Sequence, residues 1–493
     1  MNLSKRRAKI VATLGPASHS PEMMRAFLES GLDVARFNFS HGGPEMHAPH
    51  IENLRRIGKE IGREAAILQD LCGPKIRTGL LEQGSIELVN GALFTLTTRI
   101  VAGDGKEVSV TYPDLAHDCT PGDKVLLDDG NITLRVEKTT DTDVICTVID
   151  GGILKNNKGI NLPGVKVSAP ALSQKDLNDV AWGIENGVDY VALSFVRTPQ
   201  DVLDLRKIIN DRNGHCKIIS KLEKPEAIEQ LEAIIEASDG VMVARGDLGV
   251  EMPAEEVPLL QKQIITAANK AGKLVITATQ MLESMTVNSR PTRAEANDVA
   301  NAVLDGSDAV MLSGETAAGA HPLASLQMMS RIIERVEKSA DDLWKNYRQT
   351  RRHEDEELGD FTAAICEAAA HAAAGLKAKA IACFTETGDT AREVAKYRPP
   401  VPIIAFTPDE NVARGLNLAW GVQPCVISRL NTTDEMIVHA DDVLIDSGEV
   451  QNGDRIVMTM GAPVALRGST NLLKLHRIGE VHAMNEISPK NVE

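Results

Sequence analysis

The sequence has 493 residues, and its 53 Lys and Arg against 69 Asp and Glu give a formal net charge of −16. This length favours two to four domains rather than one core, and 43% hydrophobic residues exclude a disordered chain. The acidic balance argues against sequence-independent binding to nucleic acid or anionic lipid, which both need clustered positive charge. A phosphorylated substrate would therefore need a locally positive site.

Targeting and redox signals are weak. The first apolar run, Ile10 to Leu14, is too short for a secretion signal, and no stretch approaches the roughly 20 apolar residues of a membrane helix. The 7 cysteines are scattered without a C-x-x-C pair, which favours free thiols over a disulfide framework or a zinc site. We therefore expect a cytoplasmic protein.

Short β-branched apolar runs alternate with amphipathic stretches along much of the chain. Near-continuous apolar strands separated by helices indicate a parallel sheet covered on both faces, and eight of them favour a (β/α)8 barrel. The expected strands are Lys9–Leu14, Val34–Phe39, Ala65–Asp70, Tyr190–Val196, Lys217–Leu222, Val241–Ala244, Leu274–Ala278 and Ala309–Leu312. The expected helices between them include Pro21–Ser30, Gln174–Asn186, Pro199–Asn210, Pro225–Ser238 and Pro258–Ala271.

This alternation breaks between about residues 73 and 162. The segment is rich in Gly, Asp and Thr, has turn signals such as Asp129-Gly130, and lacks helical periodicity. Its expected strands include Ser85–Leu88, Lys124–Leu127 and Thr133–Val136. We predict a small β-barrel-like domain, residues 73–158, inserted after the third barrel strand and mobile because it hangs on two connections.

A second break is the charged run Arg351–Leu358, beyond which the alternation resumes. Expected elements there are the helices Thr362–Ala374 and Thr390–Tyr397 and the strands Ala380–Phe384 and Ile403–Ala405. The predicted organisation is a barrel of residues 1–72 and 159–345, the inserted domain, and a C-terminal α/β domain of residues 346–493.

Polar residues gather where the expected barrel strands end, which is the face that carries active sites in parallel barrels. They are Arg36, Asn38, Ser40, His41, Asp70, Lys75, Arg77, Lys221, Glu223, Gly246, Asp247, Thr279, Ser313 and Glu315. Because they follow several separate strands, we expect them to converge on one rim.

These residue types fit phosphoryl transfer. Glu223 and Asp247 suit a hard divalent cation such as Mg²⁺, which prefers oxygen ligands. Lys221 lies two residues before Glu223 on the same strand face, where an ammonium could neutralise a transferring phosphoryl group. Arg36 and Arg77 could fork onto phosphate oxygens.

Each motif also has a purely structural explanation when taken alone. A Lys-x-Glu pair at a strand end can be a surface ion pair, and Arg-Gly-Asp can be a simple turn. The remaining alternatives are N-cap or turn roles for Asn38, Asp70 and Thr279, and a helix start at Ser313. Convergence on one rim is what favours a site over these alternatives.

Longer motifs resemble the pyruvate kinase family over essentially the whole chain, in order. They are Phe37–Gly42 (FNFSHG), Gly73–Gly79 (GPKIRTG), Asn161–Gly164 (NLPG), Val241–Gly249 (VMVARGDLG), Thr277–Met285 (TATQMLESM), Arg290–Asp308 (RPTRAEANDVANAVLDGSD), Met311–Ala317 (MLSGETA) and Thr470–Glu480 (TNLLKLHRIGE). The resemblance implies phosphoryl transfer from phosphoenolpyruvate to ADP, giving ATP and pyruvate in the last step of glycolysis.

The resemblance also implies roles, residue by residue. Lys221, Thr279 and Arg36 match catalytic positions, with Thr279 near the proton-delivery route, and Glu223 and Asp247 match ligands of Mg²⁺ or Mn²⁺. Arg36, Gly246, Asp247 and Thr279 match contacts to the substrate, and Arg77, Lys158 and His41 match nucleotide-side positions. The inserted domain would then close over the barrel mouth and exclude water.

The chain departs from the family pattern at a monovalent-cation site. Asn38, Ser40 and Asp70 match K⁺ ligands, but Leu71 and Lys75 stand where K⁺-requiring members have Thr and Glu. A fixed Lys75 ammonium could supply the charge of a bound K⁺, so we predict K⁺-independent activity. The alternative is that Lys75 points to solvent and a cation still binds.

The C-terminal domain carries a candidate effector loop made by Thr385, Thr387, Gly388 and Thr390. Hydroxyls and amides before a helix can bind phosphate, and the resemblance implies a phosphorylated activator there. Glu386 and Asp389 oppose an anion unless Arg392 or Lys396 compensates, and the alternative is a simple turn capped by Thr390. The resemblance also implies a homotetramer.

Two other classes compete with this function. Metal-dependent aldolases and phosphoenolpyruvate mutase-like lyases share a barrel with an acidic metal pair, but lack the inserted domain with Arg77 and Lys158. A non-enzymatic metabolite sensor would have lost Lys221, Glu223, Asp247 or Thr279, and all four are present.

Overall fold

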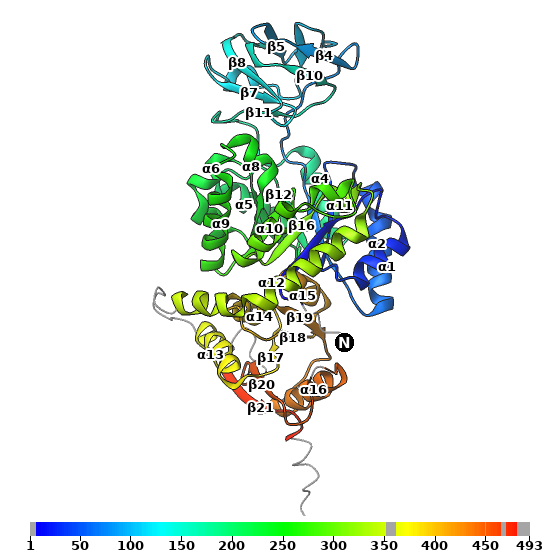
Figure 1. The fold of residues 1–493 in the computed structure, drawn as a ribbon, viewed down its shortest axis with the longest axis vertical. Helices are drawn as coiled ribbons and strands as arrows, with labels where there is room; N and C mark the ends of the chain where they lie inside the picture. Colours follow the sequence, from blue (N-terminus) through cyan, green and yellow to red (C-terminus); the bar gives the residue numbers. More distant parts are fainter. Residues whose placement is uncertain (1–5, 352–360, 449, 465–469, 481–493) are drawn as a thin grey trace, which may run out of the picture.

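Eight parallel strands close into a barrel at the centre of the molecule (Figure 1). The computed structural model describes residues 6–351, 361–448, 450–464 and 470–480. The barrel strands are β1 (Lys9–Thr13), β2 (Val34–Asn38), β3 (Ala66–Asp70), β12 (Tyr190–Leu193), β13 (Lys217–Leu222), β14 (Gly240–Ala244), β15 (Leu274–Ala278) and β16 (Ala309–Leu312). The predicted barrel is confirmed, because all eight expected strands form and β1 pairs with both β2 and β16.

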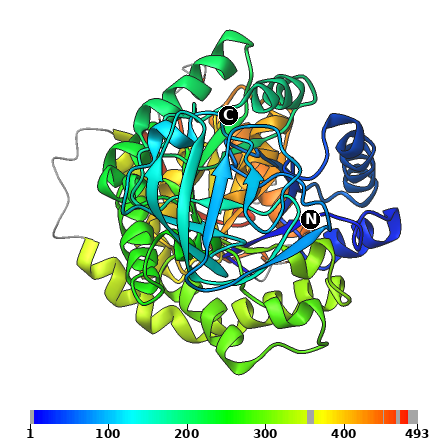
Figure 2. The same cartoon turned by 90° about the horizontal axis from the view of Figure 1, so that it is seen from above.

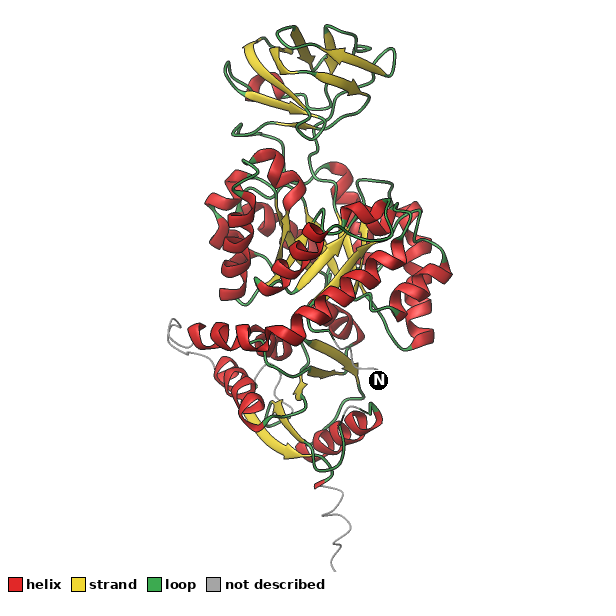
Figure 3. Ribbon diagram, viewed as in Figure 1, coloured by secondary structure: helices red, strands yellow, loops and turns green. Residues whose placement is uncertain are grey.

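The barrel helices surround the strands as an outer ring (Figure 3). They are α1 (Pro21–Glu29), α2 (Pro44–Ile61), α4 (Gln174–Glu185), α5 (Pro199–Asp211), α6 (Pro225–Glu229), α7 (Leu231–Ala237), α8 (Arg245–Glu251), α9 (Val257–Lys270), η1 (Glu283–Thr286), α10 (Arg293–Leu304), α11 (Gly314–Ala317) and α12 (Pro322–Arg351). Capping boxes begin α4, α5 and α10 at Ser173, Thr198 and Thr292, so these starts follow from local sequence.

One expected helix is wrong. The stretch Pro225–Ser238 forms two helices, α6 and α7, because Gln230 leaves the helical conformation with φ −113° and ψ 25°. Its side-chain amide donates to the carbonyl of Arg197, 3.2 Å away. Hydrophobic periodicity continues through such a break and therefore does not reveal it.

The segment inserted between β3 and β12 forms a separate β-rich unit above the barrel mouth (Figures 1 and 2). Its elements are β4 (Ser85–Leu88), β5 (Leu93–Thr97), β6 (Glu107–Ser109), α3 (Leu115–Asp118), β7 (Lys124–Leu127), β8 (Ile132–Thr139), β9 (Asp143–Asp150), β10 (Gly152–Lys155) and β11 (Ile160–Asn161). It has its own apolar core, which includes Phe94, Val125 and Leu134. The expectation of no helix is wrong, since the buried Leu115 and Ala116 anchor a single turn too short to show periodicity.

The C-terminal region is a five-stranded sheet with helices, in the order β19-β18-β17-β20-β21. Its elements are α13 (Phe361–Leu376), β17 (Ile381–Phe384), α14 (Asp389–Lys396), β18 (Ile403–Thr407), α15 (Glu410–Gly415), η2 (Leu416–Leu418), β19 (Val422–Val426), α16 (Thr433–Asp446), β20 (Arg455–Met460) and β21 (Leu472–Arg477). The charged run predicted at Arg351–Leu358 falls, from residue 352 on, outside the described residues. Within the described residues, none of the helices combines the length and the apolar character that a membrane crossing requires.

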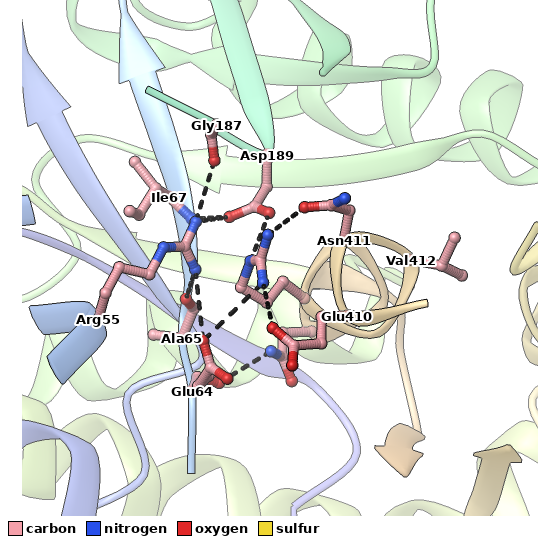
Figure 4. A network of polar contacts seen from close by, with 12 residues as sticks. Arg55, Glu64, Ala65, Ile67, Gly187, Asp189, Glu410, Asn411 and Val412 are labelled. Atoms are coloured by element: carbon pink, nitrogen blue, oxygen red, sulfur yellow. Dashed lines mark hydrogen bonds and ion pairs between the residues drawn. The ribbon is translucent and has the colours of Figure 1, made fainter. Parts of the chain in front are cut away.

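The C-terminal region meets the barrel at the amino ends of its strands. Asp189, just before β12, accepts from Arg55 of α2 at 2.7 Å and from Arg414 of α15 at 3.1 Å (Figure 4). The Tyr190 hydroxyl donates to the carbonyl of Gly415, and Lys9 Nζ donates to the carbonyl of Val422 at 2.6 Å. The opposite rim, where the strands end, is thus left for the inserted unit.

Candidate active site

A buried ion cluster occupies the rim where β2, β3 and β13 end. The Asp70 carboxylate lies 2.7 Å from Arg36 Nε and 3.3 Å from Lys221 Nζ. Burial acts to raise the pKa of Asp70, but the Lys221 and Arg36 charges overcome it and hold this pKa below its usual value. Asp70 therefore stays ionised and fixes both cations, which excludes the simple cap or turn role considered for it.

The Lys221 ammonium is the meeting point of this cluster. Its Nζ lies 2.9 Å from Glu223 Oε1 and donates to the Ser194 hydroxyl at 2.8 Å. Burial opposes the charge, yet Asp70 and Glu223 raise the pKa of Lys221 above its ordinary value. A fully charged ammonium is thereby held in a site that is nearly closed to solvent.

Glu223 and Asp247 fit a hard divalent cation. The Glu223 side chain is fully buried, its Oε2 accepts from the Phe195 amide at 2.8 Å, and its Oε1 has no partner with hydrogen-bonding geometry in the described part of the chain. Burial raises the pKa of Glu223, and the nearby Asp247 carboxylate raises it further, against Lys221. Such a buried carboxylate, beside a second one, matches the few oxygen ligands that Mg²⁺ takes from proteins. No cluster of three or more His, Cys, Asp or Glu suited to a metal occurs among the described residues.

Thr279, just after β15, and Gly246, in the first turn of α8, lie against each other. Thr279 has φ +74°, which is unusual for a β-branched residue, and a Cβ added at Gly246 would lie 2.8 Å from Thr279 Cγ2. Thr279 therefore does not cap a helix, and the cap proposed for it as an alternative is wrong, because η1 begins after Leu282. Strain in a closely packed turn at a rim is typical of functional sites.

Arg245 holds this strained turn in place. Its guanidinium donates to the carbonyls of Ala278 at 3.1 Å and Thr279 at 2.6 Å, and it pairs with Asp298 at 2.7 Å. From the sequence, Arg245 is expected only as part of an Arg-Gly-Asp turn motif. Nothing in the motif shows that its side chain would reach the next strand.

Glu315 supports the neighbouring loops. Its fully buried carboxylate accepts from the amides of Leu282 at 3.0 Å and Ser313 at 2.7 Å. Ser313 itself makes no side-chain cap hydrogen bond to α11. The Ser313-Gly-Glu-Thr motif therefore acts here through a carboxylate that ties two loops together.

Two hydroxyls of the cluster were not predicted. Thr13 Oγ1 accepts from Arg36 at 2.8 Å, and Ser194 Oγ accepts from Lys221 and donates to the carbonyl of Leu71 at 2.8 Å. Both stand at strand ends on the rim. The rule that located the other residues could have found them had it been applied to β1 and β12.

The predicted monovalent-cation positions are only partly brought together. Asn38 Oδ1 accepts from the Ser40 amide at 3.1 Å, and Asp70 is close to both cations described above. Lys75 lies instead at the base of the inserted unit, where a Cβ added at Gly159 would be 3.6 Å from its Cε. No hydrogen bond or ion pair joins the Lys75 ammonium to Asn38, Ser40 or Asp70, all four being described residues.

The nucleotide-side residues divide between two parts of the molecule. Arg77 and Lys158 share the base of the inserted unit, where Arg77 donates to the carbonyl of Asn157 at 3.1 Å and Lys158 Nζ lies 2.6 Å from Asp128. His41 is exposed on the barrel rim, and its carbonyl lies 3.1 Å from a ring nitrogen of His47. The contacts described here lie within each group and do not join the two groups. Bringing the two groups together therefore requires a movement of the inserted unit.

The candidate effector loop is internally hydrogen-bonded. The Gly388 amide donates to Thr385 Oγ1 at 2.9 Å, Thr387 donates to Asp389 at 2.6 Å, and Arg392 pairs with Asp389. Gly388, with φ +84°, precedes the first turn of α14, so the alternative that Thr390 caps this helix is wrong. Thr390 is buried and lies 2.6 Å from the Thr470 hydroxyl.

Comparison with known proteins gives a consistent result over nearly the whole chain. Residues 5–326 match the family model of the pyruvate kinase barrel domain, and residues 363–476 match that of the pyruvate kinase alpha/beta domain. A pyruvate kinase of Geobacillus stearothermophilus is 48% identical over 98% of this chain and 82% of its own. One from Mycobacterium tuberculosis is 47% identical over 96% of this chain and 99% of its own. The crystal structure of a pyruvate kinase from Cryptosporidium parvum superposes with a TM-score of 0.91 at 38% identity and covers 96% of each chain.

Proposed function

Because the chain belongs to the pyruvate kinase family, we propose that it transfers the phosphoryl group of phosphoenolpyruvate to ADP, giving ATP and pyruvate. The observation that carries this proposal is the buried Lys221 ammonium, 2.9 Å from Glu223 and 3.3 Å from Asp70 at the carboxyl ends of barrel strands. A fixed positive charge in a water-poor site stabilises charge that develops on a transferring phosphoryl group. The chain is thus a transferase that acts on two phosphorylated substrates.

A divalent cation completes the site in this proposal. Glu223 and Asp247 would hold Mg²⁺ or Mn²⁺, since the buried Glu223 carboxylate has the Asp247 carboxylate nearby and oxygen is the ligand that these cations prefer. When bound, the cation supplies positive charge to the substrate oxygens.

The residues of the chain itself bind and orient the substrate. Arg36 and Lys221 contact the phosphoryl oxygens, and ion pairs with Asp70 fix the positions of both side chains. Gly246, Asp247 and Thr279 bind the substrate carboxylate, and the absence of a Cβ at Gly246 lets the Thr279 side chain pack closely against that backbone. Thr279 is the polar group nearest to the proposed route for the proton that converts the enolate into pyruvate.

The inserted unit serves as a lid in this scheme. Arg77 and Lys158 from its base, with His41 from the barrel rim, would contact the nucleotide when the lid closes. Closure excludes water, which otherwise competes with ADP for the phosphoryl group. We propose the domain bounds predicted from the sequence, with the lid beginning at residue 73 and extended past residue 158 to include β11 (Ile160–Asn161), which pairs with β7 of the lid sheet.

A coupled pyruvate-release assay with phosphoenolpyruvate, ADP and Mg²⁺ tests the function directly. Wild type should release pyruvate only when all three are present, and Lys221→Ala should lower kcat at least about 100-fold, because one preorganised charge is removed from the site. Lys262→Ala, at an exposed lysine of α9, is the matched control and should keep the wild-type kcat. Near-normal kcat in Lys221→Ala would refute the assigned role.

K⁺ independence is a separate part of the proposal. It is supported by the exchange of a carboxylate for the Lys75 ammonium within the motif that follows Asp70. Activity in a potassium-free buffer of an organic cation should equal that with KCl. Activity that appears only after KCl is added would overturn it.

Allosteric activation by a phosphorylated metabolite at the loop 385–390 is the last part. Amides at the start of a helix favour an anion, but the Gly388 amide must first release Thr385 Oγ1, and the Asp389 carboxylate must release Arg392 before that side chain can help. Titration at low phosphoenolpyruvate with sugar phosphates and AMP tests this, and a hyperbolic response that no effector alters would contradict it. We further propose a homotetramer in the cytoplasm.

A further inference from the structure

A buried carboxylate outside the proposed site lies between the lid and the metal-ligand segments. Glu251 is the last residue of α8, the helix that begins with Arg245 and carries Gly246 and Asp247. Its side chain is 1% exposed, and its Oε2 has no hydrogen-bonding partner in the part of the chain that the structure describes. Burying a carboxylate costs free energy unless an opposite charge and hydrogen-bond donors compensate it.

Both recorded partners of Glu251 bind the same oxygen. Lys224 Nζ lies 2.5 Å from Oε1, and the side-chain amide of Asn161 donates to Oε1 at 2.8 Å. The three residues come from three places: the end of β13, the strand β11 of the lid, and the end of α8. We call this set of three residues the hinge triad.

Lys224 links the hinge triad to one metal-ligand segment. It directly follows Glu223, and its ammonium lies 6.0 Å from the centre of the Phe195 ring. Phe195, at φ +55°, gives its amide to Glu223 Oε2 at 2.8 Å. The position of Lys224 therefore affects Phe195, whose amide binds the Glu223 carboxylate, and the backbone of Glu223 itself.

Asn161 links the hinge triad to the lid. It pairs with Leu126 in the lid sheet, and the adjacent Ile160 amide donates to the carbonyl of Ile76 at 2.9 Å, so both lid connections meet here. The crevice at this point is lined by Ile76, Asn161, Leu162, Phe195, Lys224 and Asp247. A turn of the lid also approaches α8, because a Cβ added at Gly130 would lie 3.8 Å from Val250.

We propose that Glu251 is a positioning residue for phosphoryl transfer, which couples the lid hinge, through Asn161, to the metal-ligand segments, through Lys224 and α8. This inference rests on the proposed function for its catalytic consequence. Glu251 does not touch the substrate in this scheme. Its contacts fix the position of the hinge relative to the loop that carries Glu223 and the helix that carries Asp247. Lid closure and cation binding therefore depend on each other.

Three substitutions separate the two arms of the hinge triad. Asn161→Ala cuts the lid arm and should raise the KM for ADP while Mn²⁺ affinity stays unchanged. Lys224→Met cuts the metal arm and should weaken Mn²⁺ binding, measured by electron paramagnetic resonance on the free enzyme with Mn²⁺ alone. Glu251→Ala should do both, each by about 10-fold, the effect typical of losing a residue that orients a metal ligand. Hydrogen exchange of the amides at 160–165 should accelerate in Asn161→Ala and Glu251→Ala.

Glu337→Ala is the matched control. The Glu337 carboxylate is equally buried, but it accepts from the amides of Arg7 and Ala8 at the amino end of β1, far from the lid. Glu337→Ala should lower the melting temperature without changing Mn²⁺ affinity or exchange at 160–165. Glu251→Gln keeps an acceptor for Asn161 and should restore the slow exchange at 160–165 but not the full Mn²⁺ affinity.

The proposal is overturned if Glu251→Ala lowers only the melting temperature, as the control does. If Glu251→Ala does not fold, wild-type Mn²⁺ affinity in Lys224→Met together with wild-type exchange in Asn161→Ala overturns it equally. If the wild-type enzyme releases no pyruvate while Mn²⁺ binding and exchange still change as expected, the hinge triad is upheld and the proposed reaction is wrong.

Discussion

At Thr279 a β-branched residue adopts φ +74°, a conformation that L-residues with a branched Cβ rarely tolerate. Such strain is of the order of 1–3 kcal/mol and persists where the surrounding contacts over-determine the backbone. Here the contacts are the two hydrogen bonds from Arg245 to the carbonyls of Ala278 and Thr279. The strain of this turn and its position beside Gly246 both indicate that Thr279 acts at the candidate active site.

Thr279→Gly should therefore separate stability from activity. Glycine adopts positive φ without strain, so we expect the melting temperature to stay near the wild-type value despite the lost side chain. The kcat should fall by about 100-fold, because the hydroxyl at the site is removed. Calorimetry and steady-state kinetics check this, and a clearly lower melting temperature would show that the turn is not strained.

Asp70 should contribute strongly to stability through the two buried cations. Its folded-state pKa lies below the ordinary 3.8, so its stabilising effect is present above that pH and is lost as the pH falls through the lower folded value. Asp70→Asn removes the carboxylate charge beside Arg36 and leaves Lys221 with Glu223 alone, and it should cost about 3–5 kcal/mol of unfolding free energy at pH 7. Urea denaturation at pH 7 and pH 3 checks this, with the exposed Asp141→Asn as control.

We expect the difference in unfolding free energy between wild type and Asp70→Asn to be smaller at pH 3 than at pH 7. An Asp70→Asn protein whose unfolding free energy equals that of wild type at pH 7 would contradict the role assigned to the cluster.

At the scale of elements, the helices α1 and α2 meet through histidines as well as aliphatic side chains. The rings of His19, before α1, and His50, on α2, are stacked with centroids 3.7 Å apart. Burial first, and then the charges of His50 and His47, lower the pKa of His19 from 6.5 to about 4. The stacked contact therefore favours the neutral form of His19 and disfavours its protonation.

The melting temperature should consequently depend on pH between about 4 and 6.5. In that window the unfolded chain binds more protons at His19 than the folded chain does, so stability falls as the pH falls. His19→Phe keeps a stacked ring without a proton site and should flatten the pH dependence. The exposed His215→Phe should leave the slope as in wild type, and an unchanged slope in His19→Phe would show that other groups dominate it.

At the scale of the whole molecule, the barrel is held between the lid above its mouth and the C-terminal domain below (Figure 1). The lower junction includes Asp189, whose carboxylate also accepts from the Ile67 amide at 2.7 Å (Figure 4). Arg55 and Arg414 approach this carboxylate from different domains. One buried acid thus joins β3, α2 and α15.

Arg414→Met should uncouple the two domains in thermal unfolding. With the Asp189 contact reduced to Arg55 and Ile67, the C-terminal domain should unfold before the barrel, by about 2–4 °C for each kcal/mol lost. Differential scanning calorimetry should then resolve two transitions or a broadened one. Arg56→Met removes only an exposed pair with Glu60 and serves as control, and one unbroadened transition in Arg414→Met would contradict the expectation.

Elements that follow local rules could be predicted from the amino-acid sequence. The barrel strands, the capped starts of α4, α5 and α10, and the rim positions of Lys221, Glu223, Asp247 and Thr279 follow from short apolar runs and the residues that end them. The family membership followed from motifs of similarly short length. Strand ends and motifs are readable because each is encoded within about ten contiguous residues.

Contacts between side chains of distant segments arise in the folded chain and could not be predicted. The reach of Arg245 to Thr279, the ion cluster of Asp70, and the hinge triad join residues up to 151 positions apart, the separation of Asp70 and Lys221. The same holds for Lys75, which the motif associates with Asp70 but the chain places at the base of the lid. Such contacts depend on how long, flexible polar side chains leave their strands and share buried space, and no local pattern in the sequence records that.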